Sequence, residues 1–260
     1  MSGNQVYVLL GTVESSRERI VRDLSESLSP EENNPVFWMV AATDPEKDLF
    51  RQAVEDLSGK GCSLGEWHWE GDGLNVPGVP EKATIFLLAN SLEDPLNLLE
   101  QWPEIMGQNG WSLARILTAV NCRLLHDKPA LRPWFGACIH FSDYVFLANR
   151  EGVPDKWIRE YQEHFRKECY PCHFELLRKK GVKNAALVLE PEPRRISHYF
   201  DEEGEGEDSD FHEDLPDVEI TIDGDEVPEE AEDSEDPYFR KLVAGRREII
   251  LPDIRKYLPE

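Results

Sequence analysis

The segment from Gly11 to Glu18 has the spacing of a phosphate-binding loop, and it lies between an apolar run and an amphipathic stretch. In the pattern GxxxxGK[ST], glycines let backbone N–H groups wrap the phosphates, lysine neutralises them and the hydroxyl holds Mg²⁺. Here Ser16 replaces the second glycine, Arg17 replaces the lysine and Glu18 replaces the hydroxyl. Glu14 and Glu18 would also bring negative charge towards a polyphosphate. The segment therefore predicts the shape of a phosphate cradle without its charge.

Apolar runs alternate with amphipathic stretches over the first 190 residues. The runs predicted to be buried strands are Val6–Leu10, Val36–Ala42, Thr84–Ala89, Ile116–Val120, Tyr144–Ala148 and Ala185–Leu189. The stretches predicted to be helices are Glu14–Leu28, Pro45–Leu57, Pro95–Met106 and Pro154–Lys167, with residues 121–142 partly helical and broken at Pro129 and Pro133. Residues 58–82, rich in Gly, Pro and Trp, predict a long surface loop or a short hairpin. Strands that alternate with helices favour a three-layer α/β fold, a mostly parallel sheet with helices on both faces.

Five short segments resemble, in chain order, the CobW-type GTPases, which are relatives of the nickel and cobalt insertion proteins. The segments are VLLG at 8–11, GC at 61–62, IFLLANSLEDP at 85–95, ILTAVNC at 116–122 and SDYVFLAN at 142–149. The resemblance covers roughly residues 5–190 and implies a P-loop NTPase-like fold. The functional positions differ, however. In the guanine-reading motif NKxD, Asn149 is kept, the lysine is Arg150 and the aspartate is Gly152.

These replacements argue against phosphoryl transfer, because that chemistry asks the protein mainly for positioning and electrostatic stabilisation. We therefore expect a catalytically degenerate relative that binds a protein partner, or a nucleotide such as GTP, without efficient hydrolysis. In such a sheet the ligand lies at the carboxyl ends of the strands. The expected binding residues are Gly11, Ser15, Ser16, Arg17, Asn90 and Asn149. An active GTP or ATP hydrolase, with Arg17 in place of lysine, is one alternative.

A second alternative is a metal-binding protein related to the family's metallochaperones. Of the family's metal motif GCxCC, only Cys62 matches. Residues 169–173 read CYPCH, and the candidate metal ligands are therefore Cys62, Cys169, Cys172 and His173, with zinc as the ion. Covalent haem attachment at the same motif would need an oxidising compartment, which nothing at the N-terminus indicates. Incidental cysteines at a helix end are the ordinary alternative.

The charge of the chain is concentrated in one segment. Of the 52 acidic residues, 20 lie in residues 201–236, which hold no Lys or Arg. The rest of the chain therefore has a net charge of only −4, against −24 for the whole chain. This composition predicts an acidic disordered segment at 200–237, between an α/β domain at 1–199 and a short C-terminal element at 238–260 that docks on it. The absence of a basic stripe argues against a nucleic-acid partner, and the absence of long apolar runs argues against a membrane span. Five sparse cysteines predict reduced thiols in a cytoplasmic protein.

Overall fold

The computed structural model describes residues 3–28, 35–57, 59, 61–71, 73–201 and 236–258. The chain divides into two compact units, one of Met1–Ser197 with Ile250–Glu260 and one of His198–Ile249. The boundary falls inside the predicted C-terminal element, because residues 250–260 belong to the first unit. Nearly all of the predicted acidic segment, residues 202–235, lies outside the described residues.

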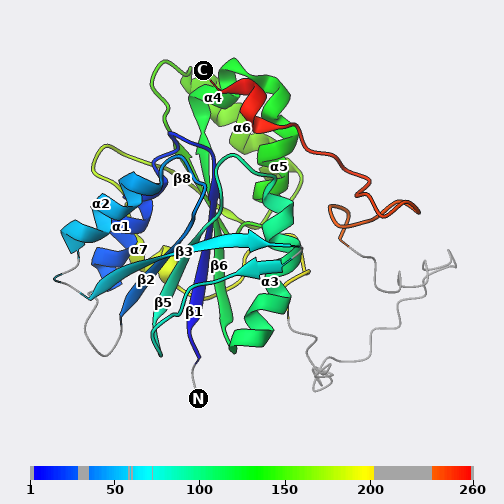
Figure 1. The fold of residues 1–260 in the computed structure, drawn as a ribbon. Helices are drawn as coiled ribbons and strands as arrows, with labels where there is room; N and C mark the ends of the chain where they lie inside the picture. Colours follow the sequence, from blue (N-terminus) through cyan, green and yellow to red (C-terminus); the bar gives the residue numbers. More distant parts are fainter. Residues whose placement is uncertain are drawn as a thin grey trace, which may run out of the picture. The chain divides into compact units, whose positions relative to one another are not determined.

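The first unit is built on one eight-stranded sheet with the order β4-β3-β2-β5-β1-β6-β7-β8 (Figure 1). The strands are β1 (Gln5–Gly11), β2 (Val36–Ala41), β3 (Cys62–Glu70), β4 (Gly73–Asn75), β5 (Thr84–Leu88), β6 (Ser112–Asn121), β7 (Tyr144–Ala148) and β8 (His173–Leu176). Neighbouring strands pair in parallel except β3 and β4, which form an antiparallel hairpin. The predicted mostly parallel sheet is therefore confirmed.

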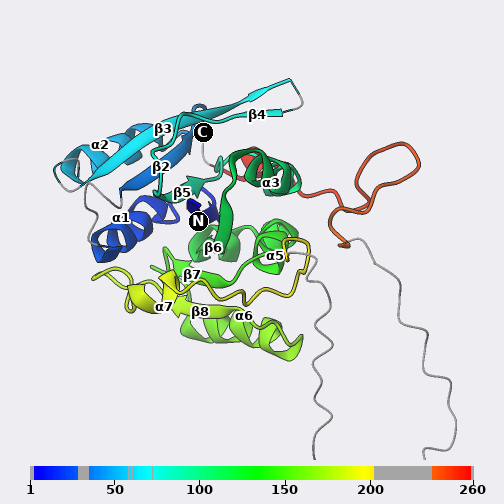
Figure 2. The ribbon, with the colours of Figure 1, turned by 90° about the horizontal axis from the view of Figure 1, so that it is seen from below.

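Helices cover both faces of this sheet, which gives three layers. The helices are α1 (Arg17–Leu28), α2 (Lys47–Leu57), α3 (Pro95–Asn109), α4 (Cys122–Asp127), α5 (Arg132–His140), α6 (Asp155–Lys167) and α7 (Ala185–Leu189). Figure 2 shows α1, α2 and α7 on one face and α3, α5 and α6 on the other. The central strands β1, β2, β5 and β7 are buried along almost their whole length, as their unbroken apolar runs predict.

Proline and polar residues set several helix ends. Asp94 caps α3, because its side chain accepts a hydrogen bond from the Leu96 N–H, and Pro95 occupies the first turn. The expected break in residues 121–142 is also present. A 3₁₀ helix, η2 (Pro129–Leu131), separates α4 from α5, and Pro133 lies in the first turn of α5, where a missing N–H costs nothing.

One predicted strand is wrong. Ala185–Leu189 is the short helix α7, capped by the Asn184 side chain, which accepts from the Leu187 N–H. A five-residue apolar run does not distinguish a strand from a buried helix, and here the run packs beside α1. The last strand is instead β8, at the edge of the sheet. Residues 58–82, predicted to be a loop or a hairpin, contribute β3 and the hairpin it forms with β4.

Aromatic side chains pack in this region and at the end of α5. Trp67 is buried, Trp69 is half-buried and His68 is exposed, so both indoles lie on one side of β3 as strand alternation predicts. His140 is half-buried, and its ring packs against the rings of Phe141 and Tyr170.

Two short features complete the described chain. In the first unit, Leu251 and Ile254 are buried, and residues Ile254–Tyr257 form the 3₁₀ helix η3 near the carboxyl ends of the strands (Figure 1). In the second unit, Lys241 and Arg247 form an antiparallel bridge, and the rings of Tyr199 and Phe239 pack with centroids 4.3 Å apart. No helix of the described ranges is both long and apolar enough to cross a membrane.

Candidate functional site

The turn between β1 and α1 has the backbone shape of a ligand-binding loop. Gly11 has a φ of 150°, and a Cβ at this position would lie 2.8 Å from the Ala119 carbonyl oxygen, so only glycine fits. Glu14 and Ser16 also have positive φ angles, of 57° and 63°. Ser16 thus keeps a left-handed conformation at the position where the loop pattern has its second glycine. The tight shape persists although the residue types have changed.

The polar atoms of this turn bond within the protein. Thr12 and Ser15 are fully buried, and the Ser15 Oγ donates to the Thr12 carbonyl oxygen at 2.7 Å. From the end of β6, the Asn121 Nδ2 donates to the carbonyls of Val13 at 3.2 Å and Glu14 at 3.4 Å. The predicted ligand residue Ser15 therefore fixes the turn from inside.

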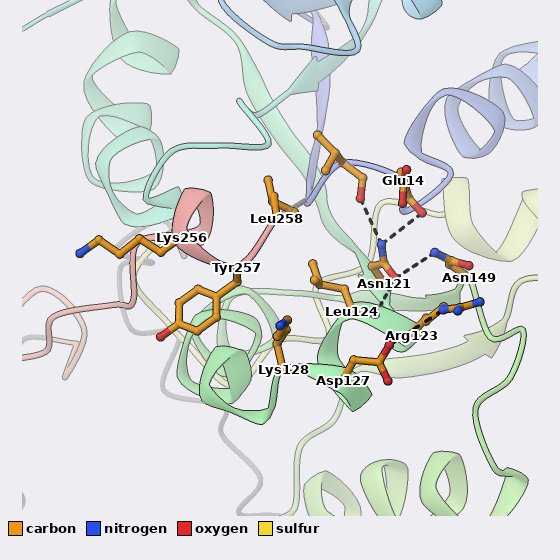
Figure 3. Close-up of a pocket in the computed structure, with 11 residues that line it drawn as sticks. Glu14, Asn121, Arg123, Leu124, Asp127, Lys128, Asn149, Lys256, Tyr257 and Leu258 are labelled. Atoms are coloured by element: carbon orange, nitrogen blue, oxygen red, sulfur yellow. Dashed lines mark hydrogen bonds and ion pairs between the residues drawn. The ribbon is translucent and has the colours of Figure 1, made fainter. Parts of the chain in front are cut away.

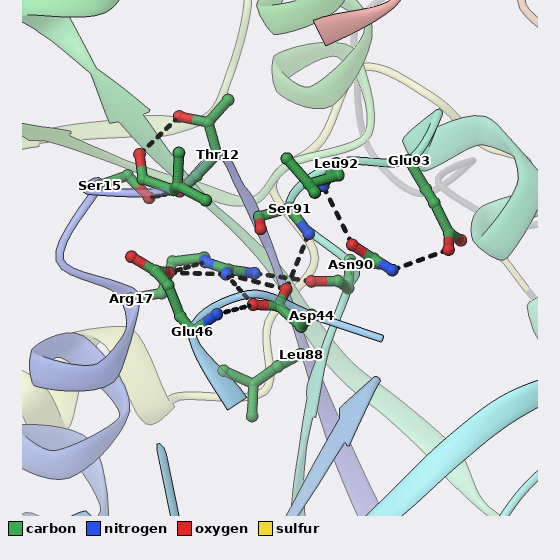
Figure 4. A network of polar contacts seen from close by, with 12 residues as sticks. Thr12, Ser15, Arg17, Asp44, Glu46, Leu88, Asn90, Ser91, Leu92 and Glu93 are labelled. Carbon is green, nitrogen blue, oxygen red and sulfur yellow. Dashed lines mark hydrogen bonds and ion pairs between the residues drawn. The ribbon is translucent and has the colours of Figure 1, made fainter. Parts of the chain in front are cut away.

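Arg17, at the position of the phosphate-binding lysine, is fully buried in a network of ion pairs (Figure 4). Its Nη2 lies 3.0 Å from the Asp44 carboxylate and 2.7 Å from the Glu46 Oε2, and the Arg17 Nε donates to the same Glu46 oxygen at 3.2 Å. Its Nη1 donates to the Ala89 carbonyl oxygen at 2.7 Å. The guanidinium carbon lies 5.3 Å from the centroid of the Phe50 ring. Most of the five guanidinium N–H donors are therefore already in use.

The network carries more negative than positive charge. One guanidinium faces two carboxylates, whose side chains are 1% exposed at Asp44 and 16% exposed at Glu46. Asp44 also accepts from the backbone N–H groups of Glu46 and Ser91, each at 2.8 Å. A phosphate brought to this turn would meet an excess of negative charge.

Asn90 lies at the same edge of the sheet, directly after β5. Its Nδ2 donates to the Thr43 Oγ1 at 2.8 Å and to the Glu93 Oε1 at 2.7 Å, and its Oδ1 accepts from the Leu92 N–H at 3.1 Å. The other Glu93 oxygen accepts from the Trp69 indole N–H at 2.8 Å. The Asn90 amide thus ties the loop after β2 to the loop after β5, and Glu93 links the second loop to Trp69 of β3.

Asn149 lies on the other side of the turn, after β7, and has a φ of 43°. Its Nδ2 donates to the Asn121 Oδ1 at 3.1 Å, and the same oxygen accepts from the Leu124 N–H at 3.0 Å as the cap of α4. The two amides thus link the ends of β6 and β7 to the turn after β1.

A cavity of about 360 Å³ opens beside these amides (Figure 3). It is lined by Val13, Glu14, Asn121, Arg123, Leu124, Asp127, Lys128, Asn149, Lys256, Tyr257 and Leu258. The helix after β1 and the helices after β6 cover opposite faces of the sheet, so the crevice between these two strands is a topological switch point. Position and volume are those of a small-molecule site, with three cations, two carboxylates and an apolar wall.

The predicted metal ligands do not converge. Cys62 begins β3 and His173 begins β8, and the six strand spacings between these strands amount to about 29 Å. Among the residues that the structure describes, no group of three or more His, Cys, Asp or Glu side chains could hold a metal ion. Burial raises the pKa of the Cys172 thiol to about 12, and burial followed by Arg194 and Arg115 lowers the pKa of His173. Cys169 is exposed at the end of α6.

Three residues that shape the site were not among the predicted ones. Asp44 and Glu46 follow β2, and Asn121 ends β6. The available signal was their position, because each is a polar residue at the end of a buried apolar run or within five residues after it. In a parallel sheet such residues gather at one edge.

Comparison with known proteins gives little beyond this geometry. The chain matches no protein-family profile and no curated protein sequence. A solved structure similar to it is that of a Zn(II)-bound triple mutant of the YjiA GTPase, with a TM-score of 0.42 and 8% sequence identity. The likeness covers 73% of this chain and 61% of that one, so the chain spans less than two thirds of its length. Function therefore has to be inferred from the site itself.

Proposed function

We propose that this chain is a binding protein with no phosphoryl-transfer activity, a degenerate relative of the CobW-type GTPases. The observation that carries this proposal is the buried network of Arg17 with Asp44 and Glu46. Phosphoryl transfer needs preorganised positive charge around the transferred group. Here the one cation of the turn is neutralised by two carboxylates of the same chain.

The other catalytic positions support the same conclusion. Glu18 stands where the loop pattern has its Mg²⁺-binding hydroxyl, and burial raises the pKa of this carboxyl. Gly152 stands where the guanine-reading aspartate would be, so no carboxylate there pairs with a base. A nucleotide would thus lack a place for its phosphates, its metal ion and the selective contact to guanine.

The cavity between β1 and β6 is the proposed binding site. Its 360 Å³ volume accommodates a nucleoside-sized molecule, and the cations Arg123 and Lys128 of the α4 side are among its lining residues. The candidate ligands are a nucleoside or nucleotide held mainly by its base and sugar. A protein partner that inserts a side chain into the cavity is the second candidate, favoured by the exposed mouth beside α4.

Thermal unfolding with ligand separates this proposal from an active hydrolase. GTP, ATP, guanosine and adenosine are each added with and without Mg²⁺, and the Tm is followed. A ligand at a hundred times its Kd raises the Tm by about 5 to 10 °C. We expect no Mg²⁺-dependent rise with either triphosphate and no phosphate release over hours. A rise of several degrees that requires both GTP and Mg²⁺ would overturn the proposal.

The same experiment locates the site with a matched pair of variants. Leu124→Trp narrows the cavity, whereas Leu49→Trp places the same ring on the exposed side of α2, outside the cavity lining. Any ligand that raises the Tm is expected to lose its effect in the first variant and to keep it in the second.

A further inference from the structure

The Glu46 carboxylate lies where the turn after β1 would hold an anion. Its Oε1 accepts from the Glu14 backbone N–H at 2.8 Å, and its Oε2 accepts from the Arg17 Nε and Nη2 at 3.2 and 2.7 Å. Backbone N–H groups of a tight turn together with a guanidinium are donors that bind phosphate oxygens. The two oxygens of one side chain therefore use donors that a phosphate would need.

Glu46 and Asp44 contribute differently to the network. Asp44 is almost completely buried, and its oxygens also accept from two backbone N–H groups, so it is part of the internal structure. The Glu46 side chain is 16% exposed and reaches the turn from the start of α2. Its backbone is held independently, because its N–H donates to Asp44 and its carbonyl accepts from the Phe50 N–H at 3.1 Å. Removing the Glu46 carboxylate would thus free the donors without removing the support of the loop.

Charge balance points the same way. With Glu46 present, Arg17 faces two carboxylates; without it, the guanidinium and Asp44 form a one-to-one pair with unused N–H donors on the turn side. An incoming anion would then supply the second negative charge that the site now obtains from Glu46.

We propose that Glu46 is the specificity-determining residue of this turn, an internal anion that keeps inorganic phosphate and the phosphate groups of esters out of the turn itself. This inference rests on the proposed function and explains how a phosphate-shaped turn is kept from binding phosphate. The shape is retained through Gly11, Glu14 and Ser16, and the exclusion comes from one side chain 29 residues beyond Arg17.

The test compares phosphate binding by the full chain and by Glu46→Ala. The ligand is inorganic phosphate, titrated at constant ionic strength against chloride, with Tm and ³¹P line width as readouts. We expect Glu46→Ala to bind phosphate at least tenfold more tightly than the unmodified chain. The matched control is Asp48→Ala, which removes the same charge from an 86% exposed side chain on α2 and should gain nothing.

A second variant keeps the test decisive if Glu46→Ala does not fold. Glu46→Gln preserves the size and one acceptor but removes the charge, and a smaller gain in phosphate binding is expected. A folded Glu46 variant that binds phosphate no better than Asp48→Ala overturns the inference. Failure of the proposed function looks different, because it is a Mg²⁺-dependent effect of GTP on the unmodified chain.

Discussion

The turn after β1 has two sides, and they differ in how their charges are used. Towards β5 and β2, Arg17 is buried against Asp44 and Glu46, and the space is filled. Towards β6 and β7, a cavity of about 360 Å³ remains, with Arg123 and Lys128 on its rim. Both sides lie at the same carboxyl edge of one sheet. The proposed binding site is thus closed on the side where the phosphates would lie and open on the other.

The difference lies in burial. The Arg17 side chain is 0% exposed and has carboxylates, a carbonyl and a ring as partners. The Arg123 side chain is 60% exposed, and its nearest carboxylate, on Asp127, is 3.9 Å away. Exposed pairs of this kind contribute at most about 1 kcal/mol, so they exchange easily for a contact with a solute. Losing one charge on the filled side would therefore leave its buried partners unpaired, whereas charges on the open side remain available for binding.

Replacing the cation of the filled side should have the largest effect. Arg17→Met leaves Asp44 and Glu46 in place without their common partner. Breaking a buried ion pair by removing one member costs about 3 to 5 kcal/mol. The measurement is the free energy of unfolding in urea.

The control for this variant is the triple change Arg17→Met, Asp44→Asn, Glu46→Gln. It removes the uncompensated charges and should recover much of the lost stability, because replacing all members of a buried ionic group is often nearly neutral. A loss below about 1 kcal/mol for Arg17→Met alone would contradict the view that this side of the turn is structural.

More of the fold than of the candidate site could be predicted from the sequence. Buried strands such as Val6–Leu10 carry unbroken apolar runs, and such runs mark strands before any contact is known. The pairing of Arg17 with Asp44 carries no such mark. In the sheet order β2 and β1 are separated by β5, and Arg17 crosses the end of β5 to reach Asp44 and Glu46. The sequence therefore shows that the turn lacks lysine, but it does not show what satisfies the arginine.

On the open side, the most important structural residue is Asn121. Asn121→Ala removes the cap of α4, two hydrogen bonds to the turn and the acceptor for Asn149. We expect a loss of about 2 kcal/mol, from one cap and two partly buried hydrogen bonds. The control is Asn109→Ala, which removes one hydrogen bond, to the Ile105 carbonyl oxygen, at the exposed end of α3. Its loss of stability should be only a few tenths of the loss expected for Asn121→Ala. Equal losses from the two variants would show that the amide pair does not hold the cavity wall.

A smaller effect is expected at Ser91, beside the filled network. Its Oγ is buried and has no hydrogen-bond partner among the residues that the structure describes, so Ser91→Ala removes an unsatisfied hydroxyl. Stability should be unchanged or rise by up to about 1 kcal/mol. The contrast is Ser142→Ala, because the buried Ser142 Oγ donates to the Cys138 carbonyl oxygen at 2.7 Å, and its loss should cost about 1 kcal/mol. A clear loss at Ser91 would mean that its hydroxyl has a partner in solution, such as a bound water or ligand.

The smallest expected effect concerns Glu18 and depends on pH. Burial raises the pKa of its carboxyl despite the nearby Arg22, so the folded protein holds this proton more tightly than the unfolded chain does. The Glu18 contribution to stability is therefore complete below the unfolded-state pKa of about 4.3 and is lost as the pH rises through the raised folded-state value. Glu18→Gln has no carboxyl group that ionises as the pH rises. Its Tm should therefore exceed that of the unmodified chain by about 1 to 2 °C at pH 7 and match it near pH 3.5.

The control variant is Glu160→Gln, which removes a carboxylate that pairs with Lys156 on an exposed face of α6 and should show no gain in Tm at pH 7. A gain at Glu18 that persists at low pH would trace to the amide itself rather than to the half-buried carboxylate beside the turn.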